Sequence, residues 1–190
     1  MRFIYEYLFL FLWLAFVIYW RVMSADVKTS ARIEGAGSRL ARAILMVVGS
    51  ALLILPRIPV AFLERRFVRL SAGSFWIGAA ITSAGLLLCV WARRHLGRNW
   101  SRAVTLKEDH ELITSGPYAV VRHPIYTGLL FALIGSALAR GEWRGVLGVA
   151  LIFAALWFKL RLEERWMREQ FGAAYEAYSR RVAALVPYLV

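Results

Sequence analysis

The sequence lacks most of the residues and motifs that mark familiar soluble enzymes. It holds one cysteine, Cys89, so it can form neither an internal disulfide nor a thiol pair for metal or redox chemistry. Cys89 lies within an apolar run, where a free cysteine is expected to act as a small hydrophobic filler. The three histidines are scattered, and there is no glycine-rich phosphate loop, no GxGxxG after a strand and no Ser/His/Asp order. We therefore expect no metal site and no phosphate cradle.

Acidic residues are also scarce. The chain has 12 Asp and Glu against 24 Lys and Arg, which gives a formal net charge of +12. Such an excess can indicate nucleic-acid binding, but no basic helix carries interleaved stacking aromatics in a polar setting. Basic residues also gather in cytoplasmic loops and near anionic lipid headgroups, which fits this composition better. We expect the lipid bilayer as a partner and no nucleic acid.

What the chain has in abundance is hydrophobic sequence. Sixty per cent of its residues are apolar, and they form long runs rather than narrow stripes. Such runs cross the ~30 Å hydrocarbon core as helices. The predicted fold is an all-α integral membrane protein, one structural domain with about five transmembrane helices. The expected spans cover residues 3–20, 43–63, 73–91, 125–138 and 146–160, and two prolines should end the second helix near Leu55.

The last two spans should pack as an antiparallel helical hairpin, because only the short turn 140–144 separates them. Residues 159–178 contain no proline and repeat apolar residues every three or four positions, with Gly172 as the one breaker. This pattern predicts that the hairpin is extended by a cytosolic amphipathic helix. Residues 183–190 are too short to cross a bilayer and should pack on the protein or dip into the interface. In the third span, a small-residue side suited to close packing is formed by Gly78, Ala80, Ser83, Ala84 and Gly85.

The distribution of basic residues predicts the orientation of the chain. With the N-terminus outside, the cytoplasmic segments are residues 21–42, 92–122 and the tail from Lys159, which together hold most of the 24 Lys and Arg. The C-terminus and the segment 92–122 then share the side where soluble nucleotide cofactors occur. We expect residues 1–91 to form the lipid-facing, substrate side and residues 92–190 to form the catalytic half.

One polar constellation stands out in this second half. The turn-rich segment 110–124 leads into a hydrophobic helix, and Pro124 suits the first turn of that helix. His123 and Tyr126 are thereby held at the mouth of a span, where polar groups are costly and usually have a function. In an antiparallel hairpin this mouth meets the end of the next span, where Lys159 and Glu163 share one helix face. Singly, these are ordinary interfacial charges; together they predict a site.

The same residues carry a family resemblance. They are similar to the isoprenylcysteine carboxyl methyltransferase family, part of a wider group that includes phospholipid N-methyltransferases, over about residues 99–187. The similar segments are the run from His110 to Tyr118, the motif from Arg122 to Gly128, the pair Glu163-Glu164, Phe171-Gly172, and Tyr175 with Tyr178. The resemblance implies a membrane methyltransferase that takes S-adenosyl-L-methionine from the cytosol and releases S-adenosyl-L-homocysteine. Its methyl acceptor would be lipophilic and would arrive from the bilayer.

The resemblance also implies residue roles. The cofactor shell would comprise His110, Glu111, Leu112, Ile113, Tyr118, His123, Pro124, Ile125, Tyr126 and Glu163. The catalytic residues on the acceptor side would be Lys159, Arg161 and Glu164. Eukaryotic carboxyl methyltransferases have an arginine at the position of Lys159; lysine keeps the positive charge without the bidentate fork. An ionised carboxylate acceptor needs no base, whereas an amine acceptor would favour one, and His123 and Glu164 are the candidates.

Two alternative functions are open from the sequence. Membrane sterol and other carbon–carbon double-bond reductases that use NADPH share a related C-terminal half, although they are usually much longer. A non-catalytic membrane scaffold or lipid-binding protein would bind no nucleotide and would leave Glu163-Glu164 without a role. Titration with S-adenosylhomocysteine and with NADPH separates these alternatives from a methyltransferase.

Overall fold

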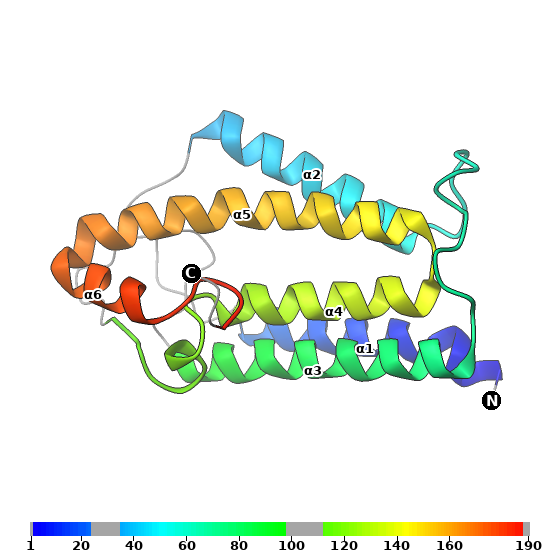
Figure 1. The fold of residues 1–190 in the computed structure, drawn as a ribbon, viewed down its shortest axis with the longest axis horizontal. Coiled ribbons are helices and arrows are strands. Elements are labelled where there is room, and N and C mark those ends of the chain that lie inside the picture. The colour runs from blue at the N-terminus through cyan, green and yellow to red at the C-terminus, as the bar shows by residue number, and fades with distance from the viewer. Residues whose placement is uncertain (1, 24–34, 98–111, 188–190) are drawn as a thin grey trace.

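The computed structural model describes residues 2–23, 35–97 and 112–187, and this part of the chain is helical apart from its loops and two isolated β-bridges. Five long helices lie along one axis and alternate in direction (Figure 1). They are α1 (Arg2–Met23), α2 (Ala36–Ile54), α3 (Ala72–Leu96), α4 (Pro124–Arg140) and α5 (Trp143–Phe171). A 3₁₀ helix, η2 (Gly116–Ala119), precedes α4, and α6 (Ala173–Arg181) follows α5. The predicted all-α fold is confirmed.

The long helices fall where the sequence predicts membrane spans. Three of them, α2, α3 and α5, are long and apolar enough to cross a membrane, while Tyr7–Met23 of α1 and the whole of α4 are shorter apolar helices. Ile54 is the last residue of α2, and Leu55 caps it, directly before the first of the two prolines. The short connection at Gly141 and Glu142 makes α4 and α5 an antiparallel hairpin, as expected.

The closest helix pair is α3 with α4, which make the most extensive contact of the bundle. Two pairs of glycines lie face to face, Gly78 against Gly135 and Gly85 against Gly128, and a β-carbon built on any one of them would clash with the backbone of its partner helix. The absence of side chains lets the two backbones touch. Gly78 and Gly85 thus serve the predicted packing role, whereas Ala80 and Ala84 are exposed.

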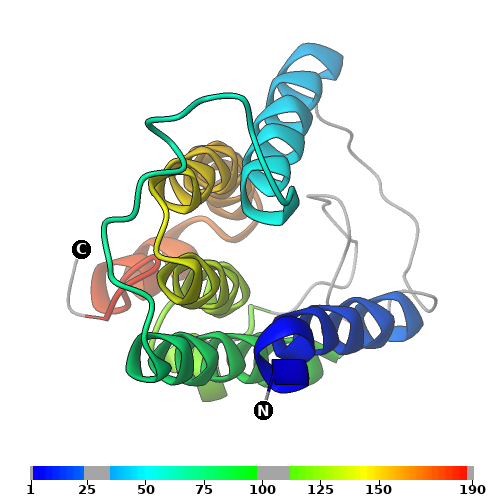
Figure 2. The same ribbon diagram turned by 90° about the vertical axis from the view of Figure 1, so that its right-hand side faces the viewer.

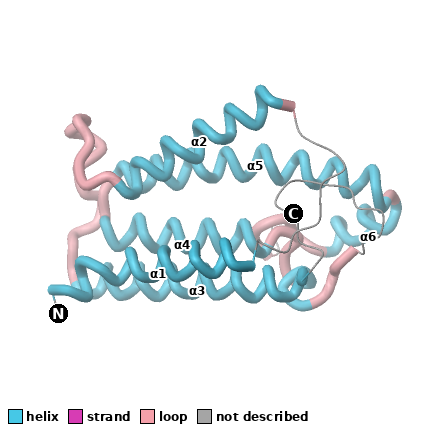
Figure 3. Tube along the Cα trace, turned by 180° about the vertical axis from the view of Figure 1, so that it is seen from behind, coloured by secondary structure: helices cyan, strands magenta, loops and turns pink. Residues whose placement is uncertain are grey.

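The other two helices cover the α3–α4–α5 layer from one flank (Figure 2). There α2 packs on α5 and α1 on α3, and the view from behind shows α1 lying along α3 and α4 (Figure 3). A core cluster of Leu133, Ile152 and Leu156 joins α4 to α5, and Trp13 of α1 packs against it. The indole of Trp13 also donates a hydrogen bond to Ser136 Oγ at 3.1 Å, so α1 is tied to α4 by a polar contact.

Two arginines secure the end of the bundle where α2 stops and α5 begins. Arg144 is 2% exposed and donates to the carbonyls of Leu55 and Pro56, while Arg140 donates to those of Leu53 and Leu55. Both guanidinium groups also pair with Glu142. Because the last carbonyls of a helix have no intrahelical donors, these side chains cap α2 from the α4–α5 turn.

The opposite end differs from the single amphipathic helix predicted for residues 159–178. The helix is interrupted at Gly172, whose φ of 50° lies in the left-handed region, and α6 folds back beneath the end of α5 (Figure 1). Tyr175 and Tyr178 of α6 are buried by this reversal. The segment after α6, residues 182–187, returns to the start of α4; we refer to it as the C-terminal strap.

Candidate functional site

The polar constellation is built on the first turn of α4. Pro124 is the first residue of this helix and is buried, and the carbonyl of His123 accepts the Thr127 backbone N–H at 3.0 Å. Just upstream, Gly116 has a φ of 59° and packs directly against the His95 ring, where a β-carbon would clash. The turn and the proline together fix where His123 and Tyr126 lie.

Glu163 is the first of two carboxylates that organise the site. The Tyr126 hydroxyl donates to Glu163 Oε1 at 2.6 Å, and Lys159 Nζ lies 3.7 Å from the same oxygen. On the other side, His123 Nδ1 is 3.6 Å from Glu163 Oε2. The planes of the His123 and Tyr126 rings differ by 4°, so the two rings stack. The Lys159 ammonium lies over the Tyr126 ring. The mouth of α4 and the end of α5 therefore meet as predicted.

Glu164 is the second carboxylate, and its surroundings are different. Arg122 donates to Glu164 Oε1 from Nε at 2.8 Å and from Nη2 at 2.6 Å, and Arg168 Nη2 donates to Oε2 at 3.2 Å. The side chain is 4% exposed. Since both oxygens are held by guanidinium groups, this carboxylate is already neutralised within the protein.

Arg122 extends this anchor to the end of the chain. Its Nη1 donates to the Ser179 carbonyl at 2.8 Å and also to that of Val182. The strap is held further by backbone bonds from Arg122 and His123 to residues 183 and 184, and by Thr127 Oγ1 donating to the Leu185 carbonyl at 2.7 Å. Of the two predicted positions for this segment, packing on the protein is the one seen for residues 183–185.

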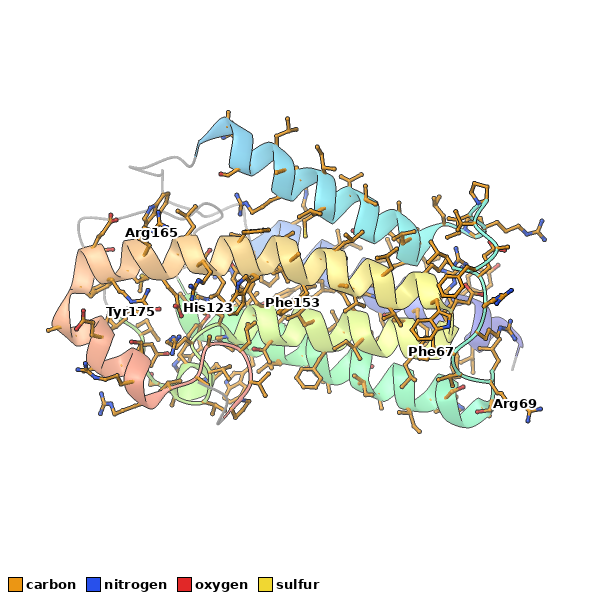
Figure 4. All side chains as sticks on the ribbon, turned by 45° about the horizontal axis from the view of Figure 1, so that its top comes forward. Phe67, Arg69, His123, Phe153, Arg165 and Tyr175 are labelled. Carbon is orange, nitrogen blue, oxygen red and sulfur yellow. The ribbon has the colours of Figure 1, made fainter. Side chains whose placement is uncertain are left out.

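His123 lies between the two carboxylates, and Figure 4 shows it beside α5, near the end of the bundle that carries Tyr175. Its Nε2 is 3.5 Å from Glu164 Oε1, beyond a good hydrogen-bond length, and this buried atom makes no hydrogen bond within the described part of the chain. This buried ring nitrogen has only a long contact with Glu164, so it keeps capacity for a hydrogen bond with a ligand group. Glu163, at 22% side-chain exposure, and Lys159, at 28%, complete an edge that is partly open. The site thus offers the His123 ring nitrogen, the Glu163 carboxylate as an acceptor, the Lys159 cation and the Tyr126 ring face. These are the groups that fit a charged nucleoside.

Three buried tyrosines, Tyr118 of η2 and Tyr175 and Tyr178 of α6, pack next to the two carboxylates and the strap. Tyr178 donates from its hydroxyl to the Tyr118 carbonyl at 2.6 Å. Burial raises the pKa of Tyr178 to about 12, and it raises the pKa values of Tyr118 and Tyr175 as well. All three therefore stay protonated near neutral pH and act as hydrogen-bond donors or packing groups rather than as bases.

The structure brings some of the predicted site residues together and places others elsewhere. His123, Tyr126, Lys159, Glu163 and Glu164 form the cluster just described. Arg161 contacts the exposed Trp157 ring, away from Glu163, and Tyr118 stacks on His95. Pro124 and Ile125 shape the first turn of α4, and Leu112 and Ile113 are half-buried. His110 and Glu111 lie outside the described residues.

Two residues of the arrangement were not in the predicted set. Arg122 joins α5, α6 and the strap, and its place directly before His123 was the signal available in the sequence. His95, at the end of α3, hydrogen-bonds Ser115 Oγ at 2.9 Å and supports the turn before η2; no pattern around His95 indicated this contact. Among the described residues, no group of three or more His, Cys, Asp or Glu is arranged to hold a metal ion.

The site and its scaffold match a family of membrane enzymes. The family model described as phospholipid methyltransferase matches residues 74–174, more than half of the chain. The chain belongs to this family, and its matched region runs from the first turn of α3 to the start of α6, including both carboxylates and the mouth of α4.

Relatives within this group confirm the resemblance to isoprenylcysteine carboxyl methyltransferases. The chain is 34% identical over 99 residues, 49% of its length, to the protein-S-isoprenylcysteine O-methyltransferase of Schizosaccharomyces pombe, covering 41% of that protein. It is 26% identical over 121 residues to protein-S-isoprenylcysteine O-methyltransferase B of Arabidopsis thaliana, covering 60% of this chain and 61% of that protein. It is also 29% identical over 116 residues to the nickel-cobalt-cadmium resistance protein NccN of Alcaligenes xylosoxydans xylosoxydans, covering 60% of this chain and 53% of that protein.

A solved structure supports the fold. The eukaryotic intramembrane Ras methyltransferase ICMT superposes with a TM-score of 0.53 over 84% of this chain and 55% of that chain, at 22% identity. The chain thus spans about half of the length of the relatives and the structure that it matches.

Proposed function

We propose that this protein is an S-adenosylmethionine-dependent membrane methyltransferase that acts on a lipophilic acceptor, of the isoprenylcysteine carboxylate or phospholipid kind. The observation that carries the proposal is the contact between the motif at the start of α4 and the Glu163-Glu164 pair of α5. His123 and Tyr126 of α4 lie within 3.6 Å of Glu163 of α5, so one small ligand can touch all three.

In this proposal the first turn of α4 binds the cofactor. Glu163 accepts hydrogen bonds from its hydroxyl or amino groups, His123 uses the unbonded Nε2, and Tyr126 offers a ring face. His110, Glu111, Leu112 and Ile113, with Tyr118, complete the shell through the approach to η2. When bound, S-adenosylmethionine supplies a methyl group that is activated by its sulfonium charge.

Alignment is the main contribution of the protein, because methyl transfer is an in-line displacement. Lys159 attracts an anionic acceptor and directs it toward the cofactor edge, and Arg161 contributes positive charge at the lipid-facing side of α5. A carboxylate acceptor needs no base. For an amine acceptor, His123 is the group that takes the proton, since Glu164 is held by Arg122 and Arg168. We assign to Glu164 the role of positioning His123, through the 3.5 Å contact with its ring and through Arg122, the residue before it.

The proposed topology puts this site on the cytoplasmic side. With the N-terminus outside and five alternating spans, the site, the strap and the C-terminus share the end of the bundle that carries most of the basic residues. Residues 92–190 then form the catalytic half, while residues 1–91 shape the side that faces the lipid and the acceptor.

Cofactor binding tests the proposal directly. Purified protein titrated calorimetrically with S-adenosylhomocysteine should bind it, and NADPH should give no heat. His123→Ala and Glu163→Ala should each lose at least tenfold in affinity, because each removes a polar contact of about 1.4 kcal/mol or more. Arg165→Ala, an exposed residue of the same helix end, is the matched control. Unchanged binding in both site variants refutes the assignment; labelled methyl transfer into total lipid extract then identifies the acceptor.

A further inference from the structure

A second site lies on the outer face of the C-terminal strap, away from His123 and Glu163. A hollow of about 210 Å³ opens there between three segments. Its walls come from the end of η2 with Val120, from the last turn of α6 with Arg180 and Arg181, and from the strap, which contributes Val182, Ala183 and Pro187. None of the residues that bind Glu163 lines it, so the hollow is separate from the proposed methyl-transfer site.

The charge of the hollow is of one sign. Among the described residues, Arg180 and Arg181 are its charged lining residues, both are exposed, and no carboxylate lines it. Arg181 donates from Nε to the Ala177 carbonyl at 3.3 Å, which holds its stem against α6. Within the described residues, no ion pair neutralises either guanidinium. Two adjacent guanidinium groups without an acidic partner favour an anion, and a phosphate above all.

The position of the hollow indicates that this phosphate belongs to a membrane lipid. The strap is bonded to the first turn of α4, where the chain changes from polar to apolar sequence, so the hollow lies at the level of the membrane boundary. Val120, which lines the hollow, is 54% exposed, and Val186, next to the lining residue Pro187 in the strap, is 47% exposed. Exposed apolar side chains next to basic ones are the pattern with which proteins rest on the interface, the apolar groups facing the acyl chains and the basic groups the phosphates. A soluble phosphate would gain nothing from the two valines.

From this geometry we infer that the hollow binds the headgroup of an anionic phospholipid, such as phosphatidylglycerol. Arg180 and Arg181 hold the phosphate, and Val120 and Val186 contact the start of the acyl chains. Ser179 and Val182, which line the hollow, also accept hydrogen bonds from Arg122 through their carbonyls. A lipid in the hollow therefore braces the segment that holds the first turn of α4, and this holds whether or not the protein transfers methyl groups.

Native mass spectrometry of the purified full-length protein in detergent tests this inference without any measurement of activity. Phosphatidylglycerol and phosphatidylcholine are titrated separately, and the fraction of protein with one bound lipid is measured. We expect phosphatidylglycerol to bind preferentially. Each arginine replaced should weaken it about fivefold, so that Arg180→Gln with Arg181→Gln weakens it about 25-fold. Arg165→Gln makes the same charge change as either single replacement, at the same end of the bundle, and should leave binding within twofold.

Several outcomes overturn the inference. If the two lipids bind equally well, the hollow does not recognise the anionic headgroup. If Arg165→Gln weakens binding as much as a single replacement in the hollow, the effect comes from overall charge. If glycerol phosphate competes as well as the lipid, the ligand is a soluble phosphate rather than a membrane lipid. Val120→Asp provides a second variant that keeps both arginines. It should also reduce phosphatidylglycerol binding, and a variant that unfolds is recognised by its circular dichroism spectrum. If the wild-type protein fails to bind S-adenosylhomocysteine, the proposed function is refuted, but the lipid-binding measurement is unaffected.

Discussion

The contact between Arg122 and Glu164 leads to a prediction about stability that can be worked out from the structure. Both side chains are largely buried, at 10% and 4% exposure, and Arg122 holds the carboxylate with two nitrogens. In Arg122→Met the carboxylate keeps the His123 ring at 3.5 Å and Arg168, which is 46% exposed and therefore largely screened by solvent. Removing one partner of a buried ion pair costs about 3–5 kcal/mol.

For a chain of this size, that loss corresponds to a decrease of about 6–20 °C in Tm. The assay is thermal unfolding in detergent followed by circular dichroism, with Arg165→Met as the control because Arg165 is exposed at the same end of α5. Adding Glu164→Leu to Arg122→Met should restore part of the loss, since the stranded charge disappears. The double variant should stay below wild type, because the Ser179 and Val182 carbonyls still lack their donor.

Two results would refute this reasoning. One is an Arg122→Met protein that unfolds within about 2 °C of wild type, which would mean that the pair contributes as little as a surface ion pair. The other is a double variant whose loss equals the sum of the single losses, which would mean that the two residues act independently.

Three further predictions concern packing and titration. Gly85→Leu should separate α3 from α4 and lower the Tm by several degrees, whereas Ala84→Leu, on the exposed side of the same turn, should change it little; equal effects would contradict the close approach. Tyr178→Phe should remove a donor from a buried carbonyl and cost about 1–3 kcal/mol. Because the folded pKa of Tyr178 is raised to about 12, the wild-type bond is fully present below pH ~10 and is lost as the pH rises through 12, so the difference between the two proteins should shrink across that interval. Cys89, which is 0% exposed, should react with a maleimide after denaturation and resist it in the native protein; rapid native labelling would show that the α3–α4 contact opens.

Much of this arrangement follows from sequence pattern alone. The end of α2 at Ile54 follows from prolines that cannot continue a helix, and the α4–α5 hairpin follows from a turn too short for anything else. Once the hairpin is given, the encounter of His123 and Tyr126 with Glu163 follows too, because the start of one arm lies beside the end of the other.

Other features depend on contacts that sequence spacing does not reveal. Gly172 was recognised as a breaker, but the reversal of the chain there was not predicted, because the apolar repeat continues across it and carries no information about the direction of the second helix. The binding of Arg122 to Glu164 and to carbonyls of α6 depends on that reversal, so it was hidden as well. Arg161 is a different case: two residues after Lys159 on a helix is a rotation of about 200°, which already places the two side chains on opposite faces.

The arginine caps at the far end of the bundle have a consequence for the order in which the protein can assemble. All of α2 is described, and Gly49 is its one buried residue, resting against α5. The carbonyls at its C-terminus are satisfied by Arg140 and Arg144, which are synthesised much later. While the ribosome is still making the middle of the chain, α2 has neither its packing partner nor its cap. It must stay in the lipid without these contacts, so the helix that is synthesised second can be among the last to pack into the bundle.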